Sequence, residues 1–166
     1  KEREQQGGQG FTFAWHAGSE LSESQWDFVY RCYANTYHVR GQAPYLTRLF
    51  FSLLAQRQPE SIRVVIASQS GRSVAMAFSL QAGDTLYGRF WGCVGEYAGL
   101  HFETCFYQGM DYAITNKLQR FDAGAQGDHT LIRGFGPVLT NSWHSLCHPG
   151  LRDAVANFLA EERPAV

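Results

Sequence analysis

Three apolar runs of strand length follow one another in SIRVVIASQSGRSVAMAFSLQAGDTLYGRFWGC, residues 61–93. The runs 61–69, 72–81 and 84–93 are rich in Val, Ile, Phe and Tyr, which favour β-strands. Ser70-Gly71 separates the first two runs, and Gly83-Asp84 joins the last two. Short connections that contain glycine are typical of hairpins, so this stretch predicts an antiparallel meander of three strands.

The residues before the meander predict one strand and two helices. Residues 11–18 alternate between apolar and polar side chains, as a strand does. Apolar residues then recur at helical spacing over 19–39 and again over 44–59. The expected ends of these helices are residues with capping or helix-breaking chemistry: Ser22 or Ser24, then Pro44 or Thr47, and finally Pro59.

The residues after the meander predict a further helical layer and two more strands. A loop dotted with glycines over 92–99 leads into a helix over 100–118. The remaining expected elements are a short strand over 120–125, a last strand over 137–144 and a terminal helix over 149–163.

This order of elements predicts an α/β, or α+β, layered domain in which helices flank a mixed sheet that contains the meander. Residues 1–10 are polar and rich in glycine, and we expect them to be a linker or the end of a missing upstream element. Residues 11–166 are expected to form one domain, because a chain of 166 residues is long enough to bury one core.

The composition is that of a globular protein without a net electrostatic bias. Hydrophobic residues make up 45% of the chain, charged residues 17%, and the formal net charge is −1. These values exclude a disordered chain and give no reason to expect binding to DNA or to a membrane surface. The longest apolar runs are too short to span a membrane. The 4 cysteines are scattered, so we expect a reducing, cytoplasmic setting.

One later stretch, FDAGAQGDHTLIRGF at residues 121–135, combines three glycines with several chemically capable side chains. Gln126, Asp128, His129 and Arg133 follow the expected short strand. Loops held by a rigid scaffold often carry functional residues, and the arginine fork suits a carboxylate or a phosphate. The stretch therefore predicts a binding or catalytic loop. The alternative is a network of hydrogen bonds that only braces a turn.

Several motifs resemble those of a bacterial family and occur in the same order. They are PYLTRLFF at 44–51, LYGRFWG at 86–92, LHFETCFYQGMDYAI at 100–114 and FDAGAQGDHTLIRGF at 121–135, followed by Thr140 and His144. Over these motifs the chain is similar to the FemAB-like proteins linked to peptidoglycan biosynthesis, within the GNAT acyltransferase superfamily. The predicted order of elements is also that of the GNAT fold. The resemblance spans nearly the whole chain from Phe11 onward.

The resemblance implies a GNAT-type fold and transfer of an acyl or aminoacyl group to an amine, without a metal. The donor would be acyl-coenzyme A or aminoacyl-tRNA, neither of them covalently held, and the acceptor a cell-wall precursor. Family members are longer, so this chain would be their C-terminal half and would work with a GNAT-like upstream half. Asp128 stands where the family usually has Glu, and Thr130 where it usually has Lys.

Acyl transfer needs a base for the incoming amine and donors that polarise the carbonyl. The expected bases are Glu103 and His101, which open the helix over 100–118. A polar stripe of that helix, with Tyr107 on its flank, would line a cleft. The expected hydrogen-bond donors are Arg133, Gln126 and His129. The alternative is that Glu103 only complements the helix dipole and His101 bonds a backbone carbonyl.

GNAT proteins bind the donor's pyrophosphate where the fourth strand passes into a helix. Their signature there is Gln or Arg, two residues, Gly, one residue, then Gly or Ala. The corresponding residues here start at Arg89, but Val94 takes the place of the last small residue and Gly95 comes one position late. We expect Arg89, Gly92, Gly95 and Gly99 to bind the donor's phosphates, the alternative being a flexible connection. Arg89 and Trp91 are expected on one face of the strand, which would meet the donor, the alternative being that Trp91 only covers the sheet.

Other interpretations compete with these. His144, Cys147 and His148 are near helical spacing, but no second ligand pair accompanies them, so we expect no metal site. Cys105, near His101, is more often a buried apolar residue than a nucleophile. The competing class of function is a binding module, a GNAT fold without transfer chemistry that recognises a cell-wall precursor or a protein. A silent half that completes a partner domain is a further alternative.

Overall fold

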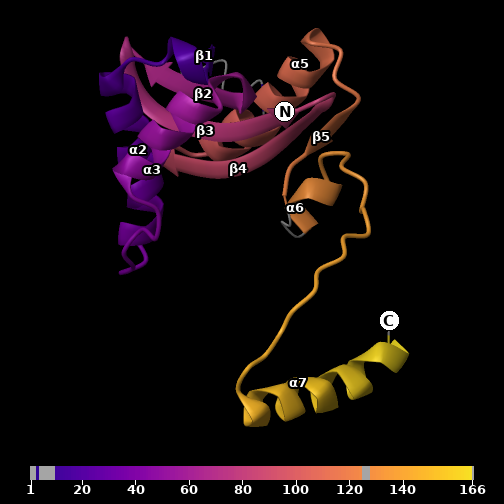
Figure 1. The fold of residues 1–166 in the computed structure, drawn as a ribbon. Helices are drawn as coiled ribbons and strands as arrows, with labels where there is room; N and C mark the ends of the chain where they lie inside the picture. The colour runs from indigo at the N-terminus through magenta and orange to yellow at the C-terminus, as the bar shows by residue number, and fades with distance from the viewer. Residues whose placement is uncertain (1–2, 4–9, 125–127, 166) are drawn as a thin grey trace. The chain divides into compact units, whose positions relative to one another are not determined.

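The computed structural model describes residues 3, 10–124 and 128–165 (Figure 1). A five-stranded sheet has the order β1-β2-β3-β4-β5, with antiparallel pairing from β1 to β4 and a parallel pair between β4 and β5. The strands are β1 (Phe11–Ala17), β2 (Ile62–Gln69), β3 (Arg72–Ala82), β4 (Thr85–Cys93) and β5 (Arg120–Asp122). The mixed sheet with its antiparallel meander confirms the predicted fold class.

The helices precede and follow the meander, as the sequence predicts. They are α2 (Glu23–His38), α3 (Arg48–Arg57), α4 (Leu100–Phe102), a π-helical turn (Glu103–Tyr107), α5 (Gln108–Thr115), α6 (Asp128–Leu131) and α7 (Pro149–Glu162). Ser22 caps α2 in a capping box with Gln25, and Thr47 caps α3 through its side chain. Pro59 ends the second helical segment by opening a short 3-10 turn. Each cap satisfies a backbone N–H that the first helical turn leaves without a partner.

The sheet buries both of its faces. On one face Phe78 and Met76 pack with α2 residues such as Trp26 and with Phe51 of α3. On the other face Leu100 of α4 packs against Ala67, Ala75 and Trp91, while the rings of Tyr112 of α5 and Trp15 of β1 pack with their centres 4.4 Å apart. Full burial of one large apolar side chain contributes about 1.5–3 kcal/mol, so these two layers hold the sheet in place.

A bulge in β4 changes which side chains share a face. Phe78 pairs with Phe90 and Ser79 with Gly88, so Arg89 is the extra residue on β4. The Arg89 guanidinium lies 5.1 Å from the Phe90 ring, on the side that packs on α2. Trp91 packs on the opposite side with Leu100. The prediction that Arg89 and Trp91 share one face is therefore wrong, because the bulge breaks the alternation.

The chain divides into two compact units, Lys1–Phe135 and Gly136–Val166. The second unit contains α7, which was predicted with nearly the same ends, and no described residue of α7 is buried. Residues 137–144 form no strand, so the predicted last strand is wrong. These residues have no partner strand in the described chain, and a strand needs a neighbour to satisfy its backbone. No helix among the described residues has the length and apolarity needed to cross a bilayer.

Candidate active site

The site region begins where β4 and β5 part. β5 pairs only with Thr85, Leu86 and Tyr87, the first residues of β4. Beyond Tyr87, the β4 edge that faces away from β3 has no strand partner in the part of the chain described here. Backbone N–H and C=O groups on such an edge can hydrogen-bond an extended ligand.

Side chains from α2 occupy part of that edge. Thr36 Oγ1 donates to the Trp91 carbonyl at 2.8 Å, and Asn35 Nδ2 donates to the Cys93 carbonyl at 2.8 Å. Between these two positions Gly92 packs on the α2 backbone, where an added Cβ would lie 2.0 Å from the Cys32 carbonyl oxygen. The structure thus gives Gly92 a packing role, and its binding of phosphates stays a prediction.

The helix after β4 is interrupted by the π-helical turn. Gly99 starts α4 in the left-handed region, at φ 75°, and Gly95 lies beside the Tyr97 ring. Within the turn, the Gln108 N–H donates to the Glu103 carbonyl, an i to i+5 bond. Such turns are rare and occur frequently at functional sites, because they redirect the side chains that follow.

His101 lies against the aromatic residues beside the free edge of β4. Its ring centre is 5.2 Å from that of Trp91, 5.2 Å from that of Phe102 and 5.7 Å from that of Phe106. We call His101, Trp91, Phe102 and Phe106 the aromatic cluster. His101 is half-buried, so it is held in place by rings on several sides and still reaches solvent.

Arg133 reaches the same cluster from the other end of the chain's first unit. Its guanidinium carbon lies 3.6 Å from the centre of the Phe102 ring and 5.8 Å from that of Phe106. Phe135, two residues later, packs on Phe106 at 5.7 Å and on Phe121 of β5 at 5.3 Å. The structure therefore brings His101 and Arg133 together around Phe102 and Phe106.

Glu103 has different partners. Its side chain is only 6% exposed, and its carboxylate accepts from the Arg3 guanidinium at 3.2 and 3.3 Å. Gln108 Nε2 also donates to Glu103 Oε1 at 2.9 Å. Tyr107 lies below the Arg3 guanidinium, at 5.4 Å from the ring centre. The two residues predicted as alternative bases, Glu103 and His101, thus stand in separate surroundings.

The other predicted site residues are not brought into the aromatic cluster by any described contact. Gln126 lies outside the described residues, and the side chains of Asp128 and His129 do as well, although their backbone opens α6. Arg89 is exposed and lies near the Tyr37 and Tyr45 hydroxyls. Burial raises the pKa of Tyr37, whereas for Tyr45 a hydrogen bond with Tyr37 is the main cause of the raised pKa.

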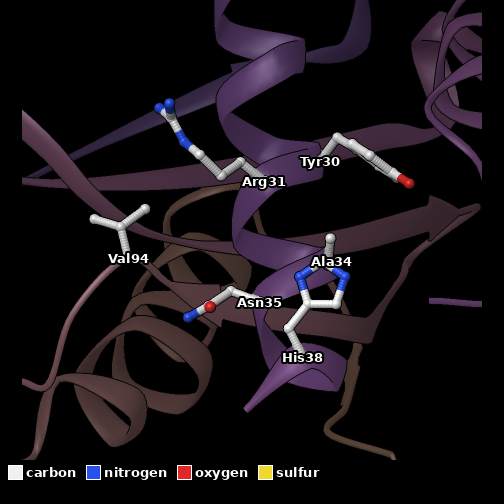
Figure 2. Close-up of a pocket in the computed structure, with 6 residues that line it drawn as sticks. All are labelled: Tyr30, Arg31, Ala34, Asn35, His38 and Val94. Carbon is white, nitrogen blue, oxygen red and sulfur yellow. The ribbon is translucent and has the colours of Figure 1, made fainter. Parts of the chain in front are cut away.

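A pocket that sequence reasoning missed lies along α2. Its volume is about 390 Å³, and it is lined by Tyr30, Arg31, Ala34, Asn35, His38 and Val94 (Figure 2). Arg31, Asn35 and His38 come from successive turns of the helix, and Val94 comes from the segment that follows β4. The helical spacing of these polar residues could have indicated a polar site along α2. Nothing in the sequence indicated that Val94 would close one side.

The residues considered for a metal or a nucleophile have other surroundings. Among the described residues, no group of three or more His, Cys, Asp or Glu side chains could hold a metal ion. His144 Nε2 lies 2.9 Å from Ser142 Oγ, and His148 Nδ1 accepts from the Leu151 N–H at the start of α7. Burial raises the pKa of the Cys105 thiol well above its usual range, which favours an apolar role over that of a nucleophile.

The cysteines are expected to react with Ellman's reagent in two clearly separated phases at pH 8. Cys147 is exposed and should react first, whereas burial raises the pKa of Cys32 to about 12 and that of Cys105 further. Cys32, which is buried, and Cys105, which is partly exposed, should react about a hundredfold more slowly, because only the thiolate attacks the reagent. A Cys147→Ser variant should lose the fast phase. A fast phase that persists in this variant would contradict the assignment.

A model of the FemAB_like family, described as peptidoglycan biosynthesis/recognition, matches residues 1–166. This chain belongs to the FemAB_like family. The match confirms the resemblance carried by the motifs. No curated protein matches the sequence.

Solved structures with the same fold as this FemAB_like chain include acetyltransferases. A probable acetyltransferase has a TM-score of 0.58 and 9% identity, covering 81% of this chain and 97% of its own. The aminoglycoside acetyltransferase meta-AAC0020 from an uncultured soil metagenomic sample, in complex with sisomicin, gives 0.56 and 10%, covering 82% and 96%. AAC(6')-Iy, in complex with the bisubstrate analog CoA-S-monomethyl-acetylneamine, gives 0.55 and 8%, covering 82% and 99%. At such low identity these structures show the fold alone.

Proposed function

We propose that this protein transfers an acyl group from a thioester donor to an amine, with His101 as the general base. The observation that carries the proposal is that His101 and Arg133 both contact the Phe102 and Phe106 rings, next to Trp91 of β4. A half-buried imidazole and a guanidinium are the base and the electrostatic donor that acyl transfer needs.

In this reaction the amine nitrogen attacks the carbonyl carbon of the thioester, so a C–N bond forms and the C–S bond breaks. His101 accepts the proton that the amine loses and returns it to the departing thiolate. Arg133, whose guanidinium lies over the Phe102 ring, stabilises negative charge on the carbonyl oxygen or on the donor. Glu103 is the less suitable base, because its carboxylate is already bound by Arg3 and Gln108.

Acyl-coenzyme A is the proposed donor, since a related fold was solved with a coenzyme A bisubstrate analog. The donor's phosphates would meet the N–H groups around Gly95 and Gly99, before α4. Aminoacyl-tRNA is the alternative donor. The family description supports an amine of a cell-wall precursor as the acceptor, and a cytoplasmic location would give access to it. An upstream GNAT-like half of the same protein would complete the cleft.

A binding module is the second candidate function, and one observation favours it. The Trp91 and Cys93 carbonyls already accept hydrogen bonds from Thr36 and Asn35. These two carbonyls are therefore occupied before any thioester binds. Val94, at the last position of the phosphate signature, points the same way. Such a protein would recognise a peptidoglycan precursor without modifying it.

Titration calorimetry and a transfer assay would separate the two functions. Acetyl-coenzyme A and charged tRNA are titrated first, and then a muropeptide with a free amine is added while thiol release and the mass of the muropeptide are measured. Binding of the thioester followed by acylation of the amine supports the transferase. Muropeptide binding without any donor binding, in a chain that includes the upstream segment, would overturn the transferase in favour of the module.

A further inference from the structure

A positively charged group is held on one face of the segment formed by the π-helical turn and α5. The Arg3 guanidinium contacts the Glu103 carboxylate through Nε and Nη2, at 3.3 and 3.2 Å. The same guanidinium contacts both carboxylate oxygens of Asp111, with Nη1 at 3.3 Å from Oδ1 and Nη2 bound to Oδ2. Arg3 is 100 residues away from Glu103 in sequence, so this is a long-range tertiary contact and not a pair within one helix.

Besides two carboxylates, an aromatic ring and an amide lie near this guanidinium. Its carbon lies 5.4 Å from the centre of the Tyr107 ring, within the range of a cation–π contact. Gln108 Nε2 donates to Glu103 Oε1 at 2.9 Å and fixes the orientation of that carboxylate. We call Glu103, Tyr107, Gln108 and Asp111 the cation face. Its carboxylates, ring and amide are the groups that together recognise an organic cation in proteins.

The π-helical turn is what assembles the cation face. Glu103 and Gln108 are five residues apart, and in a regular α-helix side chains at that spacing do not lie above one another. The i to i+5 backbone bond from the Gln108 N–H to the Glu103 carbonyl brings them together, and their side chains repeat the contact. A rare helical form thus positions a charged side chain that is more than nine-tenths buried.

An ordinary surface ion pair in the same molecule shows the difference. Arg48 also bridges two carboxylates, Glu23 at 2.7 Å and Asp27 at 2.8 Å. Those carboxylates are 81% and 71% exposed, so water solvates them whether or not Arg48 is present. Glu103 is 6% exposed, and removing its cation would leave a buried, uncompensated charge.

We propose that the cation face is a binding site for an organic cation of a substrate or partner, a guanidinium or a primary ammonium group, and that Arg3 fills it as a tethered ligand. The site is separate from the aromatic cluster and does not depend on acyl transfer. Compounds with a planar cation fit it best, because two carboxylates and one ring surround the Arg3 fork.

The test uses Arg3→Gln and, as a matched control, Arg48→Gln, each titrated with methylguanidinium and methylammonium chloride. Urea, which has a similar planar shape without the charge, and sodium chloride at equal ionic strength are the solvent controls. Methylguanidinium should raise the Tm of Arg3→Gln saturably by about 2–4 °C. It should leave Arg48→Gln and the double variant Arg3→Gln/Glu103→Gln unchanged. Equal responses of Arg3→Gln and Arg48→Gln, or a response of the double variant, would overturn the proposal.

If Arg3→Gln does not fold alone, near-ultraviolet circular dichroism takes the place of Tm. Recovery of the folded signal in methylguanidinium, and not in urea or sodium chloride, supports the site. No recovery overturns it. A stronger effect of methylguanidinium than of methylammonium identifies a guanidinium as the preferred ligand, and the reverse order identifies a primary amine.

Discussion

Replacing His101 with alanine is expected to lower kcat for acyl transfer about 10²–10⁴-fold, the range that a positioned general base contributes. His101 is the titratable residue of the aromatic cluster, and its ring faces both Trp91 and Phe106. The loss should fall on kcat and leave KM for the donor nearly unchanged, because the proton transfer contributes to the transition state only. Steady-state kinetics with acetyl-coenzyme A and an amine acceptor measure both parameters.

Two controls separate the loss of a base from the loss of a packed ring. His148 is exposed at the start of α7 in the second unit, so His148→Ala should keep the full rate. Added imidazole should restore part of the rate of His101→Ala, because a diffusible base can enter the space that the side chain leaves. If His101 has a purely structural role, neither imidazole nor a higher donor concentration should restore the rate of His101→Ala. Full activity of His101→Ala would exclude His101 as the base.

Gly92→Ala should destabilise the protein by about 3 kcal/mol or more, one of the largest single-methyl effects available in this fold. The new Cβ would lie 2.0 Å from the Cys32 carbonyl oxygen and 2.9 Å from the Tyr33 nitrogen. Both atoms belong to the α2 backbone, so no side chain can rotate away, and α2 itself must move off β4. Urea unfolding followed by circular dichroism gives the free energy of unfolding.

Gly136→Ala is the matched control for that measurement. A Cβ at Gly136 meets no atom within 4 Å, so the change should alter the free energy of unfolding by less than about 0.5 kcal/mol. A Gly92→Ala protein as stable as the control would mean that α2 does not press on β4 as described. In that case the hydrogen bonds from Asn35 and Thr36 to β4 would also be in doubt.

The elements set by local chemistry could be predicted from the sequence. Ser22 and Thr47 were among the expected caps, since a hydroxyl side chain at a helix start has few other roles. The meander followed from two short glycine-containing turns, where loop length alone fixes an antiparallel pairing. The strand expected over 137–144 was wrong, because the residue types of a short stretch do not record whether a neighbouring strand exists.

The candidate site could be predicted only in part. Arg133 and His101 were expected to serve one site from their chemistry and from the family resemblance, and their contacts with the Phe102 ring bring them together. The bulge at Arg89 and the π-helical turn after Phe102 each shift side chains by one position. Neither the bulge nor the turn can be recognised from composition or periodicity. The docking of Arg3 on Glu103 depends on contacts between segments that are distant in sequence, which local patterns do not record.

The short pairing of β5 has a consequence for the local opening of the sheet. Three residue pairs join β5 to the sheet, whereas every residue of β2 is paired with β3. Amide protons of β5 should therefore exchange with deuterated solvent sooner than those of the central ladder, through local openings that leave both cores intact. Each such opening would expose the edge of Thr85, Leu86 and Tyr87 on β4 without the rest of the domain unfolding.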